Sequence, residues 1–80
     1  MKCVYLLESE NQPGRHYTGV TTDLRKRLAA HNSGKSPHTA KHMPWRVVVA
    51  LYFSDDHKAV EFETYLKSGS GQAFANRHFW

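Results

Sequence analysis

The first twenty residues constrain the fold most strongly, because two β-prone runs flank a short turn-forming segment. Residues 2–8, KCVYLLE, are apolar and include β-branched and aromatic side chains. The following SENQPG, with its proline and glycine, is typical of a hairpin loop, and residues 16–20, HYTGV, supply the return run. The sequence therefore predicts an antiparallel hairpin at the amino terminus.

A helix and a third strand are expected after the hairpin. Thr21 or Thr22 is a suitable N-cap for a helix that carries Asp23 in its first turn and ends within Asn-Ser-Gly at residues 32–34. Residues 45–53, WRVVVALYF, are apolar at both parities, which is typical of a strand covered on both faces.

The remaining segments complete the expected fold class. Ser54 can cap a second long helix, with Asp55 and Asp56 suited to its first turn and its end near Lys67. SGSG then interrupts the chain, and QAFANRHF predicts a short terminal helix. Residues 34–44 lack periodicity and are predicted to form a long basic loop. This order predicts an α+β fold in which helices flank a small three-stranded antiparallel sheet.

The length of the chain limits what it can enclose. One domain over residues 1–80, with a small core, is expected. An active site would then be a shallow groove for an extended or polymeric substrate, not a deep cofactor cavity. The single cysteine, Cys3, fits a reducing compartment, and no membrane span or targeting segment is predicted, so the expected location is the cytoplasm.

The charge balance favours a polyanionic partner. Eleven lysines and arginines stand against seven acidic residues, and nucleic acid is the commonest partner of such a surface. Three side chains of the basic loop are predicted to touch a sugar–phosphate backbone: Lys35, His38 and Lys41. Such contacts position a nucleic acid without reading its sequence. A merely solvated basic surface explains each of them equally well.

The segment DLRKRLAAHNSG at residues 23–34 holds three adjacent basic residues, of which one faces differently from its neighbours. At ~100° per residue, Leu24 and Leu28 mark the buried side of a helix, and Arg27 falls in the same arc. His31 lies four residues further on and therefore on the same face as Arg27. Both side chains either line a functional site or, on spacing alone more commonly, border the core.

The second long helix carries a carboxylate on its apolar side. Ala59, Phe62 and Leu66 define that side. Glu63 lies between them, whereas Glu61 lies opposite. Because a buried unpaired charge is costly, Glu63 is expected to meet a cation, either a basic side chain or a metal ion.

Two tyrosines occupy the two strands of the hairpin. Tyr5 and Tyr17 are expected to be neighbours, because a short hairpin makes the strands antiparallel and adjacent. Their rings can then share a face of the sheet. Without further context, two such tyrosines indicate packing.

Taken in order, these residues resemble the GIY-YIG nuclease family, and most closely its small single-domain bacterial members related to the N-terminal catalytic domain of the excision-repair nuclease. The first signature tripeptide stands as Cys-Val-Tyr at residues 3–5 and the second as Tyr-Thr-Gly at 17–19, so both tyrosines are kept. Arg27 and His31 match the arginine and histidine of the next family motif. Glu63 matches the metal-binding glutamate of the family.

The resemblance implies a metal-dependent endonuclease that hydrolyses DNA phosphodiester bonds in repair or recombination, with branched or damaged DNA as its partner. Glu63 would hold one Mg²⁺ or Mn²⁺ ion, and Arg27 would bind phosphate oxygens. Tyr5 or Tyr17 would accept a proton from the attacking water, with a pKa lowered by Arg27 and the ion. His31 would orient a tyrosine or the phosphate. Which tyrosine is the base stays open.

Other hypotheses remain beside the nuclease. A non-catalytic nucleic-acid-binding module with the same fold is compatible with Cys3, which replaces the glycine of the first tripeptide. A zinc protein that uses His38 and His42 with Cys3 or another histidine is disfavoured, because the chain has no CxxC motif. Asn76 is a candidate for an asparagine that many family nucleases carry, although no surrounding motif fixes its alignment. A protein partner is compatible with this sequence, which indicates none.

Overall fold

The structure is a computed structural model and describes residues 1–80. Its elements along the chain are β1 (Lys2–Ser9), β2 (His16–Thr21), α1 (Leu24–Asn32), α2 (Pro37–Ala40), β3 (Trp45–Phe53), α3 (Asp56–Leu66) and α4 (Gly69–His78). The predicted amino-terminal hairpin is present as β1 and β2. No helix is long and apolar enough to cross a bilayer.

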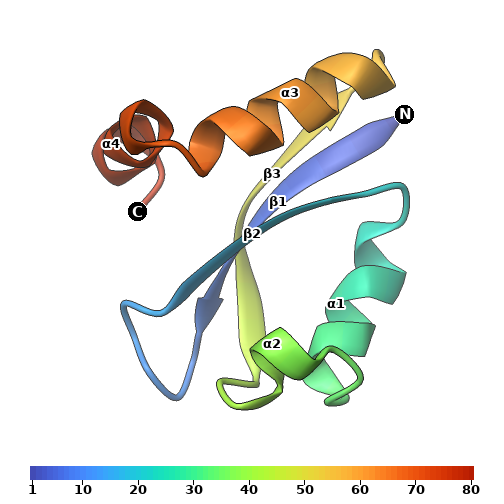
Figure 1. The fold of residues 1–80 in the computed structure, drawn as a ribbon. Coiled ribbons are helices and arrows are strands. Elements are labelled where there is room, and N and C mark those ends of the chain that lie inside the picture. The colour runs from blue at the N-terminus through green and yellow to red at the C-terminus, as the bar shows by residue number, and fades with distance from the viewer.

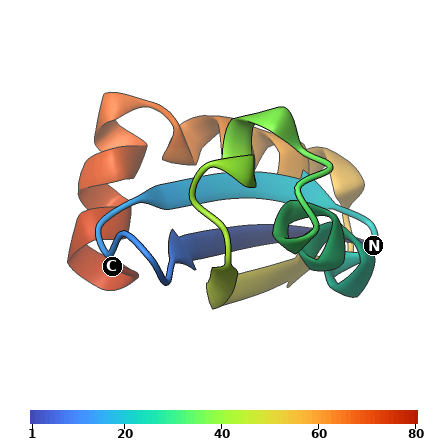
Figure 2. The same ribbon diagram turned by 90° about the horizontal axis from the view of Figure 1, so that it is seen from below.

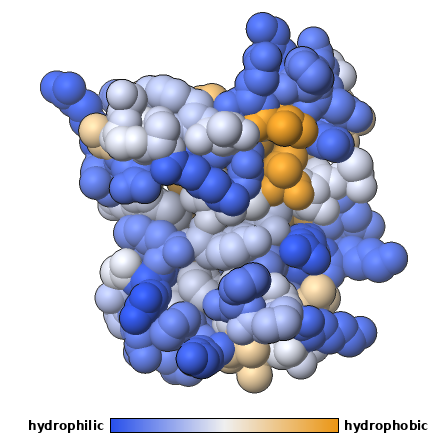
Figure 3. Space-filling model, viewed as in Figure 1, coloured by the Kyte–Doolittle hydropathy of each residue, from blue (hydrophilic) through white to orange (hydrophobic).

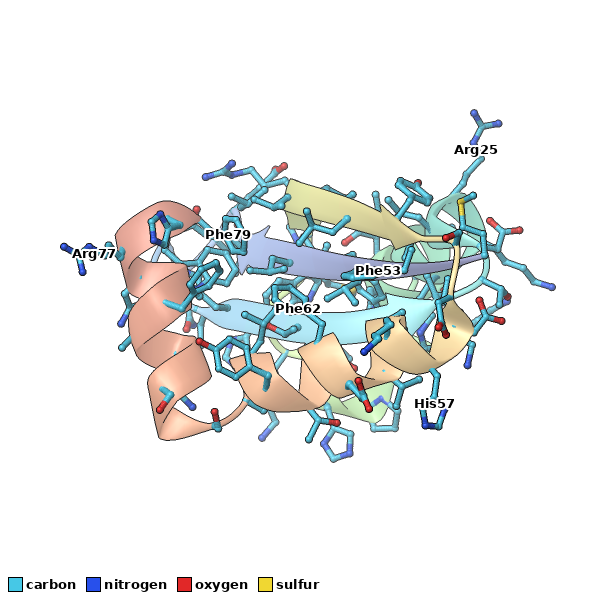
Figure 4. All side chains as sticks on the ribbon, turned by 90° about the horizontal axis from the view of Figure 1, so that it is seen from above. Arg25, Phe53, His57, Phe62, Arg77 and Phe79 are labelled. Carbon is cyan, nitrogen blue, oxygen red and sulfur yellow. The ribbon has the colours of Figure 1, made fainter.

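The three strands form one sheet in the order β2-β1-β3, and both pairs are antiparallel. Helices α1 and α2 cover one face, and α3 and α4 cover the other (Figures 1 and 2). Two views show that α3 runs along the β2 side of the sheet (Figures 2 and 4). The predicted α+β fold with a small antiparallel sheet flanked by helices is confirmed.

The central strand β1 divides its side chains between two small cores. Val4 and Leu6 face α3 and α4, whereas Cys3, Tyr5 and Leu7 face α1. All five are at most 1% exposed. The alternation follows from the period of two in a strand. It places Tyr5 under α1, on the opposite face of the sheet from the hydrophobic side of α3.

The third strand, β3, is an edge strand of the sheet, whereas β1 is the central strand. The predicted cover of β3 on both faces is present but only partial, and full burial is found in β1 instead. In β3 only Trp45 is fully buried. Val49 and Phe53 pack against the α3 side of the sheet. Val47 and Ala50 pack against the α1 side. The strand is therefore apolar at both parities because helices partly cover both of its faces, although its outer edge has no neighbouring strand.

Both expected N-caps are shifted to an aspartate. Asp23 caps α1, and its carboxylate accepts a hydrogen bond from the backbone N–H of Lys26 at 3.0 Å. Thr21 supports this turn by accepting from the backbone N–H of Asp23 at 3.1 Å. Asp55, in place of Ser54, caps α3 by accepting from two backbone N–H groups. A carboxylate gains from the positive end of the helix as well as from the hydrogen bond, which favours it over a hydroxyl.

Two segments that were expected to be irregular contain helix. The basic loop includes α2, which begins at Pro37 and is too short to show a periodicity. Thr39 in α2 is buried, and its carbonyl accepts a hydrogen bond from the indole N–H of Trp45 at 2.8 Å. At the other end of the chain, Ser68 caps α4, which begins at Gly69, so SGSG starts a helix.

Candidate active site

The register of the hairpin brings the two signature tyrosines together. Tyr5 pairs with Gly19, and Tyr17 pairs with Leu7, so the tyrosines are diagonal neighbours on one face of the sheet. Their ring centroids are 6.2 Å apart. The rings share a face, as the hairpin predicted.

Gly19 provides the space that the Tyr5 ring occupies. A Cβ at position 19 would lie 2.5 Å from the phenolic oxygen of Tyr5 and 2.6 Å from its Cζ. Tyr5 is 1% exposed, so its ring has no open space to move into. The glycine of the second tripeptide is thus required by the tyrosine of the first.

We expect Gly19→Ala to lower the free energy of unfolding by about 1–3 kcal/mol, because the added methyl forces the buried Tyr5 ring out of place. Urea denaturation followed by circular dichroism measures this change. Gly69→Ala is the matched control, since a Cβ there would meet nothing within 4 Å. Equal stability of the Gly19 variant and the wild type would show that the ring is not confined.

A chain of hydrogen bonds runs from Arg27 through Tyr5 and His31 to α2. The Nε–H of Arg27 donates to the Tyr5 hydroxyl at 3.4 Å, and that hydroxyl lies 3.0 Å from His31 Nε2. His31 Nδ1 lies 2.7 Å from Thr39 Oγ1. The Thr39 hydroxyl donates to the carbonyl of Ser36 at 3.4 Å, so its oxygen is left to accept. His31 is then protonated on Nδ1, and Nε2 accepts the Tyr5 proton.

Burial shifts the pKa values of the residues in this chain of hydrogen bonds. His31 is fully buried, and this burial, together with the nearby Arg27 guanidinium, lowers its pKa below the ordinary 6.5. Burial raises the pKa of Tyr5, although the hydrogen bond from Arg27 acts in the opposite direction. The lowered tyrosine pKa that the resemblance implies needs a bound ion as well as Arg27; for Tyr5 without an ion, the pKa is raised. The raised pKa of Tyr5 favours a neutral phenol and the lowered pKa of His31 favours a neutral imidazole, which agrees with the hydrogen-bond directions assigned above.

Stability should consequently fall on mild acidification. The unfolded chain takes up a proton at His31 near pH 6.5, whereas the folded protein resists it until a lower pH. Below pH 6.5 the unfolded state holds more protons, so this contribution is lost as the pH falls toward the folded pKa, by at most about 1.4 kcal/mol per pH unit. Urea midpoints at pH 7.5 and 5.5 measure the loss.

The control for this pH dependence is an exposed histidine. His57 points into solvent from α3 (Figure 4), so His57→Gln should keep the full difference between the two urea midpoints. His31→Gln should reduce the difference. An unchanged difference in His31→Gln would mean that other groups cause it.

Tyr17 lies between the hydrogen-bonded side chains of Tyr5 and His31 and the solvent. It is half-buried, and its ring meets the edge of the His31 ring at a centroid distance of 4.8 Å. It also lines a groove of about 360 Å³ between β2 and α4. We call this hollow the β2–α4 groove; its lining includes Tyr17, Lys67, Gln72, Asn76 and Trp80. Arg27 lines a second, smaller hollow of about 220 Å³ at the start of α1.

Glu63 lies on α3 and does not share a hydrogen bond with the four clustered side chains. Its own side chain is 13% exposed, and an oxygen lies 2.5 Å from the Nζ of Lys67. The cation that Glu63 meets is thus a lysine of its own helix. Glu61 is 60% exposed, so the helical spacing distinguished the two glutamates correctly. Lys67 lines the same groove as Tyr17, so the ion-pair partner of Glu63 borders the groove beside β2.

The donor set fits a hard ion and not a structural zinc ion. No group of three or more His, Cys, Asp or Glu side chains is placed to hold a metal ion. A structural zinc site needs four such ligands, and Cys3 is buried within β1 with its thiol directed to the carbonyl of Val4. Mg²⁺ keeps several waters and binds through one or two carboxylates plus substrate phosphate, so the lone carboxylate of Glu63 fits it.

The basic side chains predicted to contact nucleic acid are all exposed. Lys35, His38 and Lys41 surround α2, and none of them forms an ion pair within the protein. Arg25 extends away from the protein, unlike Arg27 (Figure 4). The surface that carries the β2 edge is largely hydrophilic, with one small hydrophobic patch in the upper right of the view (Figure 3).

Thr39 is a residue of the candidate site that the sequence analysis did not identify. It is 1% exposed, and its hydroxyl holds Nδ1 of His31. It lies in a segment without periodicity, so no pattern marks it as buried. Asn76, for which no motif was available, lines the β2–α4 groove together with Tyr17.

A hairpin thus pairs two tyrosines, and the helix that follows sets an arginine and a histidine beside them. The model of the GIY-YIG catalytic domain family matches residues 1–77. The chain therefore belongs to the GIY-YIG family, a family of nucleases, as its motifs predicted.

Similar bacterial proteins carry the name UPF0213. One from Streptococcus pneumoniae is 39% identical over 64 residues, which is 79% of this chain and 65% of that protein. One from Streptococcus agalactiae is 34% identical over 71 residues, 88% of this chain and 78% of that protein. This chain thus spans slightly less than two thirds of the first relative. The solution NMR structure of a UPF0213 protein from Bacillus halodurans matches with a TM-score of 0.57 and 32% identity, over 96% of this chain and 84% of that one.

Proposed function

We propose that this protein is a divalent-metal-dependent endonuclease that hydrolyses phosphodiester bonds in DNA. The observation that carries the proposal is the cluster of Tyr5, Tyr17, Arg27 and His31, which is linked by hydrogen bonds and ring contacts and borders the β2–α4 groove at Tyr17. Membership of a nuclease family supports a nucleic-acid substrate. A role in repair or recombination, on branched or damaged DNA, is the biological setting we propose.

Arg27 would bind the phosphate that is cleaved. Arg27 is an exposed residue, and its hydrogen bond within the protein runs from Nε to Tyr5. The terminal nitrogens are free to donate to two phosphate oxygens in the planar geometry that arginine offers. The bond to Tyr5 raises the pKa of Arg27 further, so the guanidinium stays charged as negative charge develops on the phosphate.

The two tyrosines would have different tasks. Tyr5 is buried, its hydroxyl already joins Arg27 and His31, and burial raises its pKa, so it positions Arg27. Tyr17 is half-buried and lines the groove, where a water can reach it. Tyr17 is therefore our candidate for the group that takes the proton from the attacking water.

Tyr17→Phe should lower the single-turnover rate of DNA cleavage by about 100-fold or more while leaving DNA affinity unchanged, because it removes only the group that accepts the proton. Quench-flow measurement of the cleaved strand gives the rate. In the companion variant Tyr5→Phe, the rate should fall together with the apparent DNA affinity, since Arg27 loses its anchor. Full activity of Tyr17→Phe would assign the base elsewhere.

Glu63 would hold one divalent ion, Mg²⁺ or Mn²⁺. Its carboxylate is largely shielded from solvent, and the neighbouring Lys67 lines the groove in which we place the substrate. Bound there, the ion would offset phosphate charge and lower the pKa of a coordinated water. Lys67 competes for the same carboxylate.

The proposal is tested with purified protein on plasmid and branched DNA, with Mg²⁺ and with EDTA in its place. Metal-dependent strand breaks are expected. A protein that binds the same DNA with a strong salt dependence but cuts none of it would instead be a binding module with the nuclease fold. Basic-loop variants at Lys35, His38 and Lys41 should reduce binding to all sequences alike.

A further inference from the structure

The β2–α4 groove extends beyond Tyr17 to a part of the fold that the proposed chemistry does not use. At this end the rings of His16 and Trp80 are stacked in parallel, with centroids 3.6 Å apart and an interplanar angle of 4°. The backbone N–H of Trp80 donates to the carbonyl of Ala75, and Nε2 of His16 lies 3.5 Å from a Glu8 oxygen. The backbone of Trp80 and the ring of His16 are thus held in place, and the two stacked rings form a flat aromatic surface in the lining of the groove.

Two amide side chains also line the groove. Gln72 and Asn76 are four residues apart on α4 and therefore lie on the same face. The side-chain N–H of Gln72 donates to the carbonyl of Lys67, which leaves the amide oxygen of Gln72 free. The side-chain amide of Asn76, which also lines the groove, has no hydrogen-bond partner in the protein. Free amides present donors and acceptors side by side, which is how a base edge is hydrogen-bonded.

We propose that the β2–α4 groove is a subsite for one unpaired nucleobase of the substrate, which stacks on the His16–Trp80 pair and hydrogen-bonds to Gln72 and Asn76. The volume of about 360 Å³ is at the small end for ligand sites and suits a single nucleotide. A base held in a duplex cannot enter such a groove, whereas a base in a flap, a bulge or a single strand can. Because Tyr17 lines the same groove, the bound nucleotide would adjoin the scissile phosphate.

This inference rests on the proposed nuclease function for its meaning but is tested without catalysis. The probes are a fluorescently labelled hexathymidylate and a hexamer of the same length with abasic residues in all positions, titrated by anisotropy in EDTA. Both carry the same phosphates, so their difference reports the bases alone. We expect hexathymidylate to bind about tenfold more tightly.

Variants separate the groove from general charge. Trp80→Ala should remove most of the preference for hexathymidylate, and Trp80→Phe should keep it, because phenylalanine still stacks. Gln72→Ala should lower the preference for hexathymidylate over the abasic hexamer a few-fold. Arg77→Ala is the control, since Arg77 points away from the protein on the same helix (Figure 4), and it should affect both probes alike.

Equal affinity of the two hexamers, or an unchanged preference in Trp80→Ala, would overturn the base subsite even if the protein cuts DNA. If Trp80→Ala fails to fold, the wild type and Gln72→Ala decide the matter with the same two probes. Conversely, a clear preference for hexathymidylate in a protein that never cuts would support the subsite and contradict the nuclease.

Discussion

Arg27→Ala should lower the rate of DNA cleavage by about 1,000-fold while the protein keeps its fold. Removing one preorganised donor at a developing negative charge typically costs two to three powers of ten in rate. Arg27 is exposed and makes a single long hydrogen bond to Tyr5, so its loss should change the free energy of unfolding by about 1 kcal/mol or less. Single-turnover cleavage and urea denaturation measure the two quantities.

Arg25→Ala is the matched control, because Arg25 lies on the same helix but extends into solvent (Figure 4). It should cut DNA at nearly the wild-type rate. Arg27→Lys keeps the charge but not the planar pair of donors, so most of the activity should still be lost. Wild-type activity in Arg27→Ala would remove Arg27 from the site.

Glu63→Gln should lower cleavage at saturating DNA by about 100-fold or more, and raising the Mg²⁺ concentration should restore part of the rate. Glutamine has nearly the same shape but lacks the charge that holds a divalent ion, and the ion contributes several kcal/mol of charge stabilisation. The lost ion pair with the half-exposed Lys67 should cost about 1 kcal/mol or less in stability. The Mg²⁺ dependence of the cleavage rate is the measurement.

Glu61→Gln controls for a general effect of charge on α3. Glu61 is 60% exposed and pairs with Lys58, so this variant should match the wild type at every Mg²⁺ concentration. If Glu63→Gln showed an unaltered Mg²⁺ dependence at full rate, Glu63 would be only the partner of Lys67 in a structural ion pair.

Much of the fold was predictable because it follows from local patterns. The turn SENQPG between two β-prone runs fixes the hairpin, and the apolar positions of the long helices are spaced at helical intervals. The position of a strand within the sheet is not local. Residues 45–53 have the composition of a central strand, yet β3 lies at the edge of the sheet. The composition does not distinguish the two positions, because partial cover from two helical layers suffices to make both faces of an edge strand apolar.

Irregular segments were the least predictable part of the fold. The four-residue helix α2 has no measurable period, and its burial depends on Thr39 meeting His31 across the fold. The caps at Asp23 and Asp55 illustrate the same limit on a smaller scale. Several hydroxyl and carboxylate residues compete within two or three positions, and the carboxylates cap both helices.

The candidate site was predictable as a set of residue types but not as an electrostatic arrangement. Helical spacing places Arg27 and His31 on one face and separates Glu63 from Glu61, and the structure agrees on both points. The direction of the Tyr5 pKa could not be predicted, because it depends on how deeply β1 is covered. The need for Gly19 likewise appears only when the register is known.

The most direct test of the nuclease assignment compares the wild type with the double variant Arg27→Ala, Glu63→Gln, purified identically, on one labelled flap DNA in Mg²⁺, with binding measured in parallel. We predict that the wild type cuts the DNA and that the double variant binds it but leaves it intact. Cleavage at an undiminished rate by the double variant, or binding without any cleavage by the wild type, would contradict the assignment.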